Sequence, residues 1–170
     1  TGKDALRLVD RIVTRDMTKV SVGQVVYTHW CDGDGKVIDD GTVSRLEENT
    51  FRWTAADPSL RWFRENALGL DVQIDDVSES TAAVALQGPT SREILKACAG
   101  DEVASLKYFR VRPFTIAGIP VEISRTGYTG DLGYEIWVDR EQALPVWDAL
   151  VTTGAHCGIT PAGIWALDLA

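Results

Sequence analysis

Apolar and polar positions alternate with two periods along this chain, one typical of helices and one typical of strands. In residues 4–16, apolar side chains recur every three or four positions, which predicts a helix. A second helix is predicted from residues 57–59, where Pro58 fits the first turn, to about residue 67. Shorter apolar segments predict strands over 24–31, 36–46, 51–55 and 70–77, with a turn at 32–35 between the first two.

The second half of the chain repeats this mixture of elements. It predicts a strand over 81–86, a helix over 91–99, strands over 106–117, 120–126 and 132–138, and a helix over 141–153. Each sheet and each amphipathic helix must cover an apolar face. We therefore predict an α+β fold of two linked lobes, 1–78 and 79–170, each an antiparallel sheet backed by helices.

The two ends of the chain suggest an internal segment of a longer protein. The chain starts at Thr1, its only methionine is Met17, and a predicted helix from Ile164 reaches the last residue without a Gly or Pro after it. We therefore expect lobe 1–78 to lack its first strand and lobe 79–170 to be truncated at its C-terminal end. A strand before residue 1 would bring the first lobe close to a split β-α-β arrangement.

Composition narrows the classes of function. The 170 residues are 45% hydrophobic and 25% charged, with a formal net charge of −8, as in many soluble globular proteins. No cluster of Lys and Arg offers the basic surface of a nucleic-acid binder, and no apolar run reaches the ~20 residues of a membrane span. Three well-separated cysteines favour reduced thiols. We expect a cytoplasmic protein with no nucleic-acid or membrane partner.

Two adjacent carboxylates, Asp39 and Asp40, stand in the predicted strand 36–46. Neighbouring residues of a strand face opposite sides, so one carboxylate points inward or into a cleft if one face is buried. There it needs a hydrogen-bonding partner. A simpler interpretation leaves both carboxylates exposed beside a bulge at Gly41, and the pattern alone favours it.

Residues 124–136 form the richest candidate site, with three glycines spaced every three residues and a tyrosine after two of them. Glycines let the backbone approach a flat ligand closely, and a tyrosine can pack on its face. Glu135 follows inside an apolar strand, where its two oxygens match any amidine-like edge. An ion pair between Glu135 and Arg125 in a hairpin is an equally good interpretation.

Signals for other chemistry are weak. The aspartates of the turn 32–35 suggest a calcium loop, but valines occupy the positions where an EF-hand needs Gly and Glu, so a simple turn is predicted. His29 and Cys31 lack a second pair of ligands, and no metal site is predicted. The glycines are not a phosphate loop, because no Lys-Ser or Lys-Thr follows them. Residues 87–89 are interpreted as a strand-to-helix junction.

Taken together, these stretches resemble the glycine-cleavage T-protein family, the folate-dependent aminomethyltransferases. The resemblance covers nearly the whole chain. Its motifs are GKVIDD at 35–40, LQGP at 86–89, RTGYTG at 125–130, GYEI at 133–136 and PAGI at 161–164, with Tyr27 close behind Gly23 and Gln24. The resemblance implies two ferredoxin-like lobes and a terminal β-barrel around a central folate cavity, with the barrel outside these residues.

The resemblance also implies roles for five residues. Asp40 matches the family's catalytic carboxylate, which lies beside the reactive nitrogen of tetrahydrofolate. Glu135 matches the acid that grips the amino edge of the pterin, whose N–H and amino group a carboxylate accepts as a fork. Tyr27, Tyr108 and Tyr128 match aromatic residues of the cavity. Asp40 would orient the carrier nitrogen, stabilise positive charge during transfer, or accept a proton.

Several positions depart from the family pattern. Leu167 replaces an arginine that borders the folate, and Thr54 replaces an asparagine and follows a bulky Trp53. Trp30 and Thr42 also differ from the usual residues. We expect these changes mostly on the donor side of the cavity, where Leu167 and the tryptophans favour an apolar donor.

The predicted function is a tetrahydrofolate-dependent one-carbon transferase. It would take an aminomethyl or methyl-derived carbon from a small molecule or a lipoyl-protein. A first alternative is a demethylase of the same fold that moves a methyl group from an N-, O- or S-methyl donor to tetrahydrofolate. Further alternatives are a non-catalytic folate-binding module and the folate domain of a flavin-linked dehydrogenase of methylated glycines. The retention of Asp40 favours catalysis.

Overall fold

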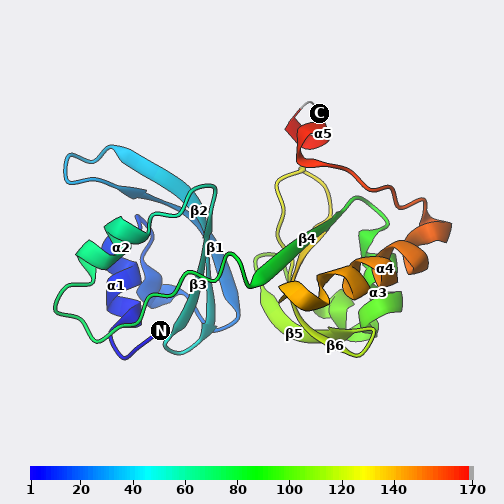
Figure 1. Ribbon diagram of the computed structural model, residues 1–170, viewed down its shortest axis with the longest axis horizontal. Helices are drawn as coiled ribbons and strands as arrows, with labels where there is room; N and C mark the ends of the chain where they lie inside the picture. Colours follow the sequence, from blue (N-terminus) through cyan, green and yellow to red (C-terminus); the bar gives the residue numbers. More distant parts are fainter. Residues whose placement is uncertain (169–170) are drawn as a thin grey trace. The chain divides into compact units, whose positions relative to one another are not determined.

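The chain folds into two compact units, and each is a sheet packed against helices. The computed structural model describes residues 1–168, with side chains described for residues 1–166. Unit 1 comprises Thr1–Asp76, and unit 2 begins at Val77 (Figure 1). No helix within these residues is long and apolar enough to cross a membrane.

Unit 1 is a three-stranded antiparallel sheet with two helices on one face. Its elements are helix α1 (Ala5–Ile12), a 3-10 helix (Met17–Lys19), strands β1 (Gln24–Cys31), β2 (Val37–Glu47) and β3 (Thr50–Ala55), and helix α2 (Leu60–Asn66). The strands lie in the order β1-β2-β3. The predicted turn forms as expected, because Asp32 Oδ1 accepts hydrogen bonds from the backbone N–H groups of Asp34 and Lys36, both at 2.9 Å.

The register of the strands assigns one face of this sheet to the helices. Val26 and Val43 face each other across β1 and β2, and both are buried in the core with α1. Trp30 is fully buried on the same face, edge-on to Trp53 at 5.3 Å between ring centroids, and Trp53 stacks on Phe63 of α2 at 4.2 Å. Trp30 is therefore a core residue, and the prediction that it lies on the donor side of a cavity is wrong.

The strand predicted over 70–77 does not form. The backbone of this segment bonds to the start of the chain, where Gln73 N–H donates to the Thr1 oxygen at 2.8 Å and the Thr1 amino group donates to the Gln73 oxygen at 2.9 Å. Val72 and Ile74 pack against the core between the sheet and α2. The alternating sequence pattern therefore reflects partial burial of every second side chain, although the segment pairs with none of the described strands.

Unit 2 is a four-stranded antiparallel sheet packed against two helices. Its elements are β4 (Thr81–Gln87), α3 (Ser91–Ala99), a 3-10 helix (Asp101–Ser105), β5 (Val111–Ile116), β6 (Ile119–Ser124), β7 (Gly133–Asp139), a 3-10 helix (Arg140–Gln142), α4 (Ala143–Gly154), a 3-10 helix (Ala155–Cys157) and α5 (Ile164–Asp168). The strand order is β4-β7-β6-β5. The strand predicted over 106–117 begins only at Val111, because Phe109 adopts a φ of 55°, which is incompatible with a strand.

One face of the second sheet meets α3 and α4 in the core of unit 2. Tyr134 and Ile136 of β7 are fully buried there, together with Leu95 of α3 and Val146 of α4. Because side chains alternate along a strand, Glu135 faces the other side of the sheet. The predicted fold class, two antiparallel sheets backed by helices, is confirmed.

Candidate functional site

Asp39 and Asp40 lie on opposite faces of β2. Asp39 faces the buried Trp30 across the ladder, which places it on the helix side of the sheet. Asp40 faces His29 on the side turned away from the helices, called here the open face. Both carboxylates are half-buried, so the interpretation that leaves both exposed is wrong. Asp39 Oδ2 is buried with no hydrogen-bond partner among the residues that the structure describes.

The bulge predicted at Gly41 is also absent. Gly41 pairs in register with Ala55 of β3, and the irregular step of the β1–β2 ladder lies between Trp30 and Cys31. A Cβ at position 41 would lie 2.1 Å from the backbone oxygen of Thr54. Glycine is therefore needed at this position because the β3 backbone approaches β2 closely.

Tyr27 and Asp40 form a hydrogen-bonded pair on the open face of unit 1. The Tyr27 hydroxyl donates to Asp40 Oδ2, and its ring meets His29 edge-on with 5.5 Å between centroids. The hydrogen bond to Asp40, followed by partial burial and the carboxylate charge, raises the pKa of Tyr27 above its usual range. Thr42 faces Tyr27 in one ladder and Thr54 in the other, so both of these departures from the family pattern share a face with Asp40.

Glu135 lies on the open face of the unit 2 sheet, opposite Ser124 in the β6–β7 ladder. The Thr126 hydroxyl donates to Glu135 Oε2, and the Ser124 hydroxyl lies 3.5 Å from the same oxygen. Both hydroxyls are buried and lie 2.7 Å from each other. This carboxylate is therefore oriented by neutral hydroxyl groups that the protein holds in place.

The ion pair between Glu135 and Arg125, which the sequence left open, does not form. The Arg125 guanidinium instead donates to the Leu106 carbonyl oxygen at 3.4 Å, and Glu135 takes its hydrogen bonds from hydroxyls. Within the part of the chain whose side chains are described, Glu135 Oε1 accepts no hydrogen bond. One carboxylate oxygen thus remains available on an open sheet face.

Gln87, which the sequence placed in a simple strand-to-helix junction, organises the glycine-rich segment. Its side-chain amide donates to the carbonyl oxygens of Tyr134 at 3.1 Å and Thr126 at 3.4 Å. A Cβ added to Gly133 would lie 1.8 Å from the Gln87 Oε1 atom, and one added to Gly127 would lie 2.3 Å from it. Two of the three evenly spaced glycines therefore make room for this glutamine, a contact that the sequence pattern could not reveal.

The other two predicted aromatic residues are exposed. Tyr108 and Tyr128 have exposed fractions of 65% and 71%. Tyr108 meets Phe109 edge-on, and the Phe109 N–H donates to the Arg125 carbonyl oxygen at 3.0 Å. The loop that carries Tyr108 is thus tied to the segment that orders Glu135. The side chain of Leu167 lies outside the described residues.

An open depression of about 500 Å³ over α3 is separate from these residues. It is lined by Pro89, Arg92, Glu93, Lys96, Ala97, Asp101 and Leu132. None of the five predicted site residues lines it, and its charged groups are of both signs. We do not assign the predicted cofactor to it.

The fold and these sites together define a class: an α+β protein of two sheet-and-helix units, each with a hydrogen-bonded carboxylate on its open face. The chain belongs to the GCVT N-terminal domain family, whose model matches residues 1–170. This membership agrees with the motifs recognised in the sequence.

Several curated relatives match nearly the whole chain. Trimethylamine-oxide aldolase of Ruegeria pomeroyi is 43% identical over 99% of this chain and 23% of its own length. The aminomethyltransferases of Streptomyces avermitilis and Halothermothrix orenii are 38% and 36% identical, over 99% and 98% of this chain. The chain spans 46% and 48% of those two proteins, about half of their length.

Solved structures show the same fold. Glycine cleavage system aminomethyltransferase T from Bartonella henselae matches 88% of this chain and 41% of its own, with a TM-score of 0.76 and 25% identity. Heterotetrameric sarcosine oxidase from Corynebacterium sp. U-96 matches 85% of this chain and 70% of its own, with a TM-score of 0.62 and 21% identity. The second similarity concerns the fold alone.

Proposed function

We propose that this chain is the folate-binding and catalytic part of a tetrahydrofolate-dependent one-carbon transferase. Family membership and the aminomethyltransferase relatives support this proposal. The observation that carries it is the carboxylate of Glu135, ordered by two buried hydroxyls on an open sheet face. In this proposal, lobes 1–78 and 79–170 belong to a longer enzyme that encloses the folate cavity.

The residues around Glu135 fit the pterin of tetrahydrofolate. A pterin presents an N–H and an amino group side by side, and a carboxylate accepts such a pair through its two oxygens. Ser124 and Thr126 fix the carboxylate before the ligand arrives, which lowers the entropy cost of binding. The exposed rings of Tyr108 and Tyr128 offer flat apolar surface in the same unit.

Asp40 is the proposed catalytic residue. Tetrahydrofolate, when bound, supplies the nitrogen that accepts the carbon unit. The Asp40 carboxylate would stabilise positive charge that develops at that nitrogen and accept a proton from it. Tyr27 is a positioning residue and also a proposed cofactor contact, since its hydroxyl fixes Asp40 through Oδ2 and its ring lies on the same open face.

The carbon donor is proposed to be an aminomethyl group on a lipoyl-protein or a methylated amine. The aminomethyltransferase relatives support the first donor. The 43% identity to a protein named trimethylamine-oxide aldolase exceeds the 36% and 38% identity to the two aminomethyltransferases, and this favours the methylated amine.

Three free thiols support a reducing compartment such as the cytoplasm.

Calorimetric titration of the full-length protein with a stable reduced folate tests the proposal. Glu135→Gln should weaken binding by about 10- to 100-fold, because hydrogen bonds to a charged group contribute about 1.5–3 kcal/mol. Asp40→Asn should bind the folate and lose carbon transfer. Glu122→Gln is the matched control, since Glu122 lies on the same sheet face and should not affect binding.

A folded protein that binds no reduced folate would refute the proposal, as would unchanged binding by Glu135→Gln. A transfer assay that offers either a lipoyl-bound aminomethyl group or a methylated amine then separates the two donors. Methylene-tetrahydrofolate formed from the lipoyl-bound aminomethyl group, with release of ammonia, identifies the first donor, and methyl-tetrahydrofolate formed from the methylated amine, with release of the demethylated amine, identifies the second.

A further inference from the structure

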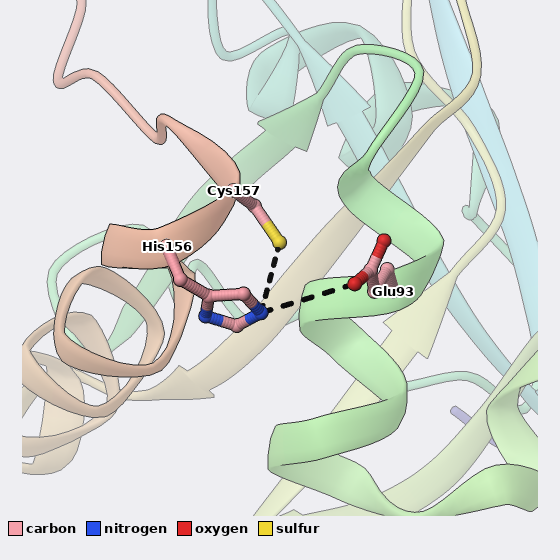
Figure 2. Close-up of side chains that lie close together, drawn as sticks. All are labelled: Glu93, His156 and Cys157. Carbon is pink, nitrogen blue, oxygen red and sulfur yellow. Dashed lines mark hydrogen bonds and ion pairs between the residues drawn. The ribbon is translucent and has the colours of Figure 1, made fainter.

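Three side chains of metal-ligating type meet between α3 and the 3-10 helix that follows α4 (Figure 2). Glu93 lies in the first turn of α3, and His156 and Cys157 lie in the 3-10 helix that follows α4. One ligand atom from each of the three lies within 4.8 Å of the others. The His156 Nε2 atom is 3.2 Å from Cys157 Sγ and 3.8 Å from Glu93 Oε1. Sequence reasoning missed this group because Glu93 is more than sixty positions from the other two.

We propose that Glu93, His156 and Cys157 form a binding site for a divalent transition-metal ion of the zinc class. In a tetrahedral zinc site, ligand atoms at ~2.0–2.3 Å from the metal lie ~3.3–3.6 Å from one another. The two distances from His156 Nε2, 3.2 and 3.8 Å, fall on either side of that range. The third pair, Cys157 Sγ and a Glu93 carboxylate oxygen, also lies within 4.8 Å, so the three ligand atoms are grouped closely enough to share one ion.

The backbone that carries these ligands is held by the fold. The Gly158 N–H donates to the Ala155 oxygen at 3.3 Å, and the Ile159 N–H donates to the Gly154 oxygen at 3.3 Å. Cys157 is half-buried and packs against the hydrophobic core of unit 2. These backbone hydrogen bonds keep the positions that carry His156 and Cys157 in place without the metal, which reduces the ordering cost of binding.

The chemistry of the ligand set selects the class of ion. An imidazole, a thiolate and a carboxylate suit zinc and its neighbours, whereas calcium and magnesium prefer oxygen ligands alone. The side chains of His156 and Glu93 are 65% and 67% exposed, so the site is open to solvent and a water molecule can complete a tetrahedron. The metal would join the start of α3 to the end of α4.

Titration of the full-length protein with Co²⁺ as a spectroscopic probe, and with Zn²⁺ in a calorimeter, tests this proposal. One equivalent of Co²⁺ should produce a thiolate-to-cobalt charge-transfer absorption. Zn²⁺ should abolish that absorption by competition and raise the melting temperature, while Mg²⁺ and Ca²⁺ should do neither. Cys157→Ser should remove the absorption, and His156→Gln should weaken binding at least about tenfold, as loss of even an outer partner of a metal site commonly does.

Cys98→Ser is the matched control, because Cys98 is also a half-buried thiol of unit 2 but donates to the Ala149 oxygen at 3.8 Å. This variant should bind Co²⁺ as the wild type does. Circular dichroism of each variant establishes that it is folded. The proposal would be overturned if folded wild-type protein bound neither ion, or if Cys157→Ser and His156→Gln left binding unchanged. The three side chains would then be a polar cluster that binds no metal.

Discussion

Tyr27 reaches diagonally across the β1–β2 ladder to donate its hydroxyl hydrogen bond to Asp40. In that ladder Tyr27 faces Thr42, so Asp40 lies two residues further along the same face of β2. The bond raises the pKa of Tyr27, because it requires the proton of the phenol. A tyrosine with a raised pKa holds its proton to higher pH, so this contact is complete at neutral pH. It is lost only as the pH rises through the raised pKa.

Replacement of the carboxylate should reverse this shift. Asp40→Asn removes the largest cause of the raised pKa of Tyr27, so that pKa should fall toward the ordinary tyrosine value. An alkaline absorbance titration measures it, with the Tyr27→Phe variant identifying which transition belongs to Tyr27. Asp39→Asn is the control, because Asp39 lies on the opposite face of β2. An unchanged Tyr27 transition in Asp40→Asn would mean that the hydrogen bond is not formed in solution.

Elements whose apolar pattern is local were predictable from the sequence. The strand 24–31 and the helix 91–99 coincide with β1 and α3. The segment 70–77 shows the limit of this reasoning, since its alternating side chains are partly buried but its backbone partner is Thr1. Which backbone group pairs with another depends on contacts distant in sequence, and periodicity does not contain that information.

In the candidate site, too, local features were predictable from the sequence, and features set by distant contacts were not. Alternation along β2 predicted that Asp39 and Asp40 face opposite sides, but only the register with Trp30 decides which of them faces the core. The glycine spacing of 127–133 suggested a ligand, although the group that fills the space is Gln87, some forty residues earlier. A single sequence does not pair residues that far apart.

The hydroxyl of Thr126 should matter for folate binding although it is buried. Thr126→Val keeps the shape of the side chain and removes the donor to Glu135 Oε2. We expect reduced-folate affinity to fall about tenfold or more, because the carboxylate loses its orientation and a charged hydrogen bond of about 1.5–3 kcal/mol. Calorimetry measures the change. Thr115→Val, at an exposed position of β5, is the control, and equal affinities for the two variants would argue against an ordered Glu135.

Two glycines should differ in how they tolerate a methyl group. Gly41→Ala places a Cβ against the backbone oxygen of Thr54, which cannot rotate away, so we expect destabilisation of about 3 kcal/mol or loss of folding. In Gly133→Ala the atoms nearest to the new Cβ belong to the end of the Gln87 side chain. The glutamine can move at the cost of its hydrogen bonds, which is about 2 kcal/mol. Urea unfolding of each variant gives these values.

A double variant tests whether displacement of Gln87 causes the destabilisation expected for Gly133→Ala. If displacement of the glutamine is the cost, Gln87→Ala combined with Gly133→Ala should destabilise unit 2 by clearly less than the sum of the single changes. Gly33→Ala is the control, because a Cβ there meets no atom within 4 Å, and its effect should stay within about 0.5 kcal/mol. Strict additivity would show that Gln87 does not fill the space beside Gly133.

Cys157 should be a slow nucleophile at neutral pH. Partial burial first, and then the nearby Glu93 carboxylate, raise the pKa of its thiol, and only the thiolate reacts with an alkylating agent. Glu93→Gln removes the second cause and leaves the first, so the midpoint of the pH–rate profile should fall while staying above that of an unperturbed cysteine. Alkylation is followed by mass spectrometry with a chelator present, in a background where Cys31 and Cys98 are changed to serine.

Glu122→Gln should leave the profile unchanged, since Glu122 lies on β6 and is not one of the groups that shift this thiol. A midpoint that stays constant or rises in Glu93→Gln would contradict the arrangement of the thiol and the carboxylate described above, and with it the geometry on which metal binding depends.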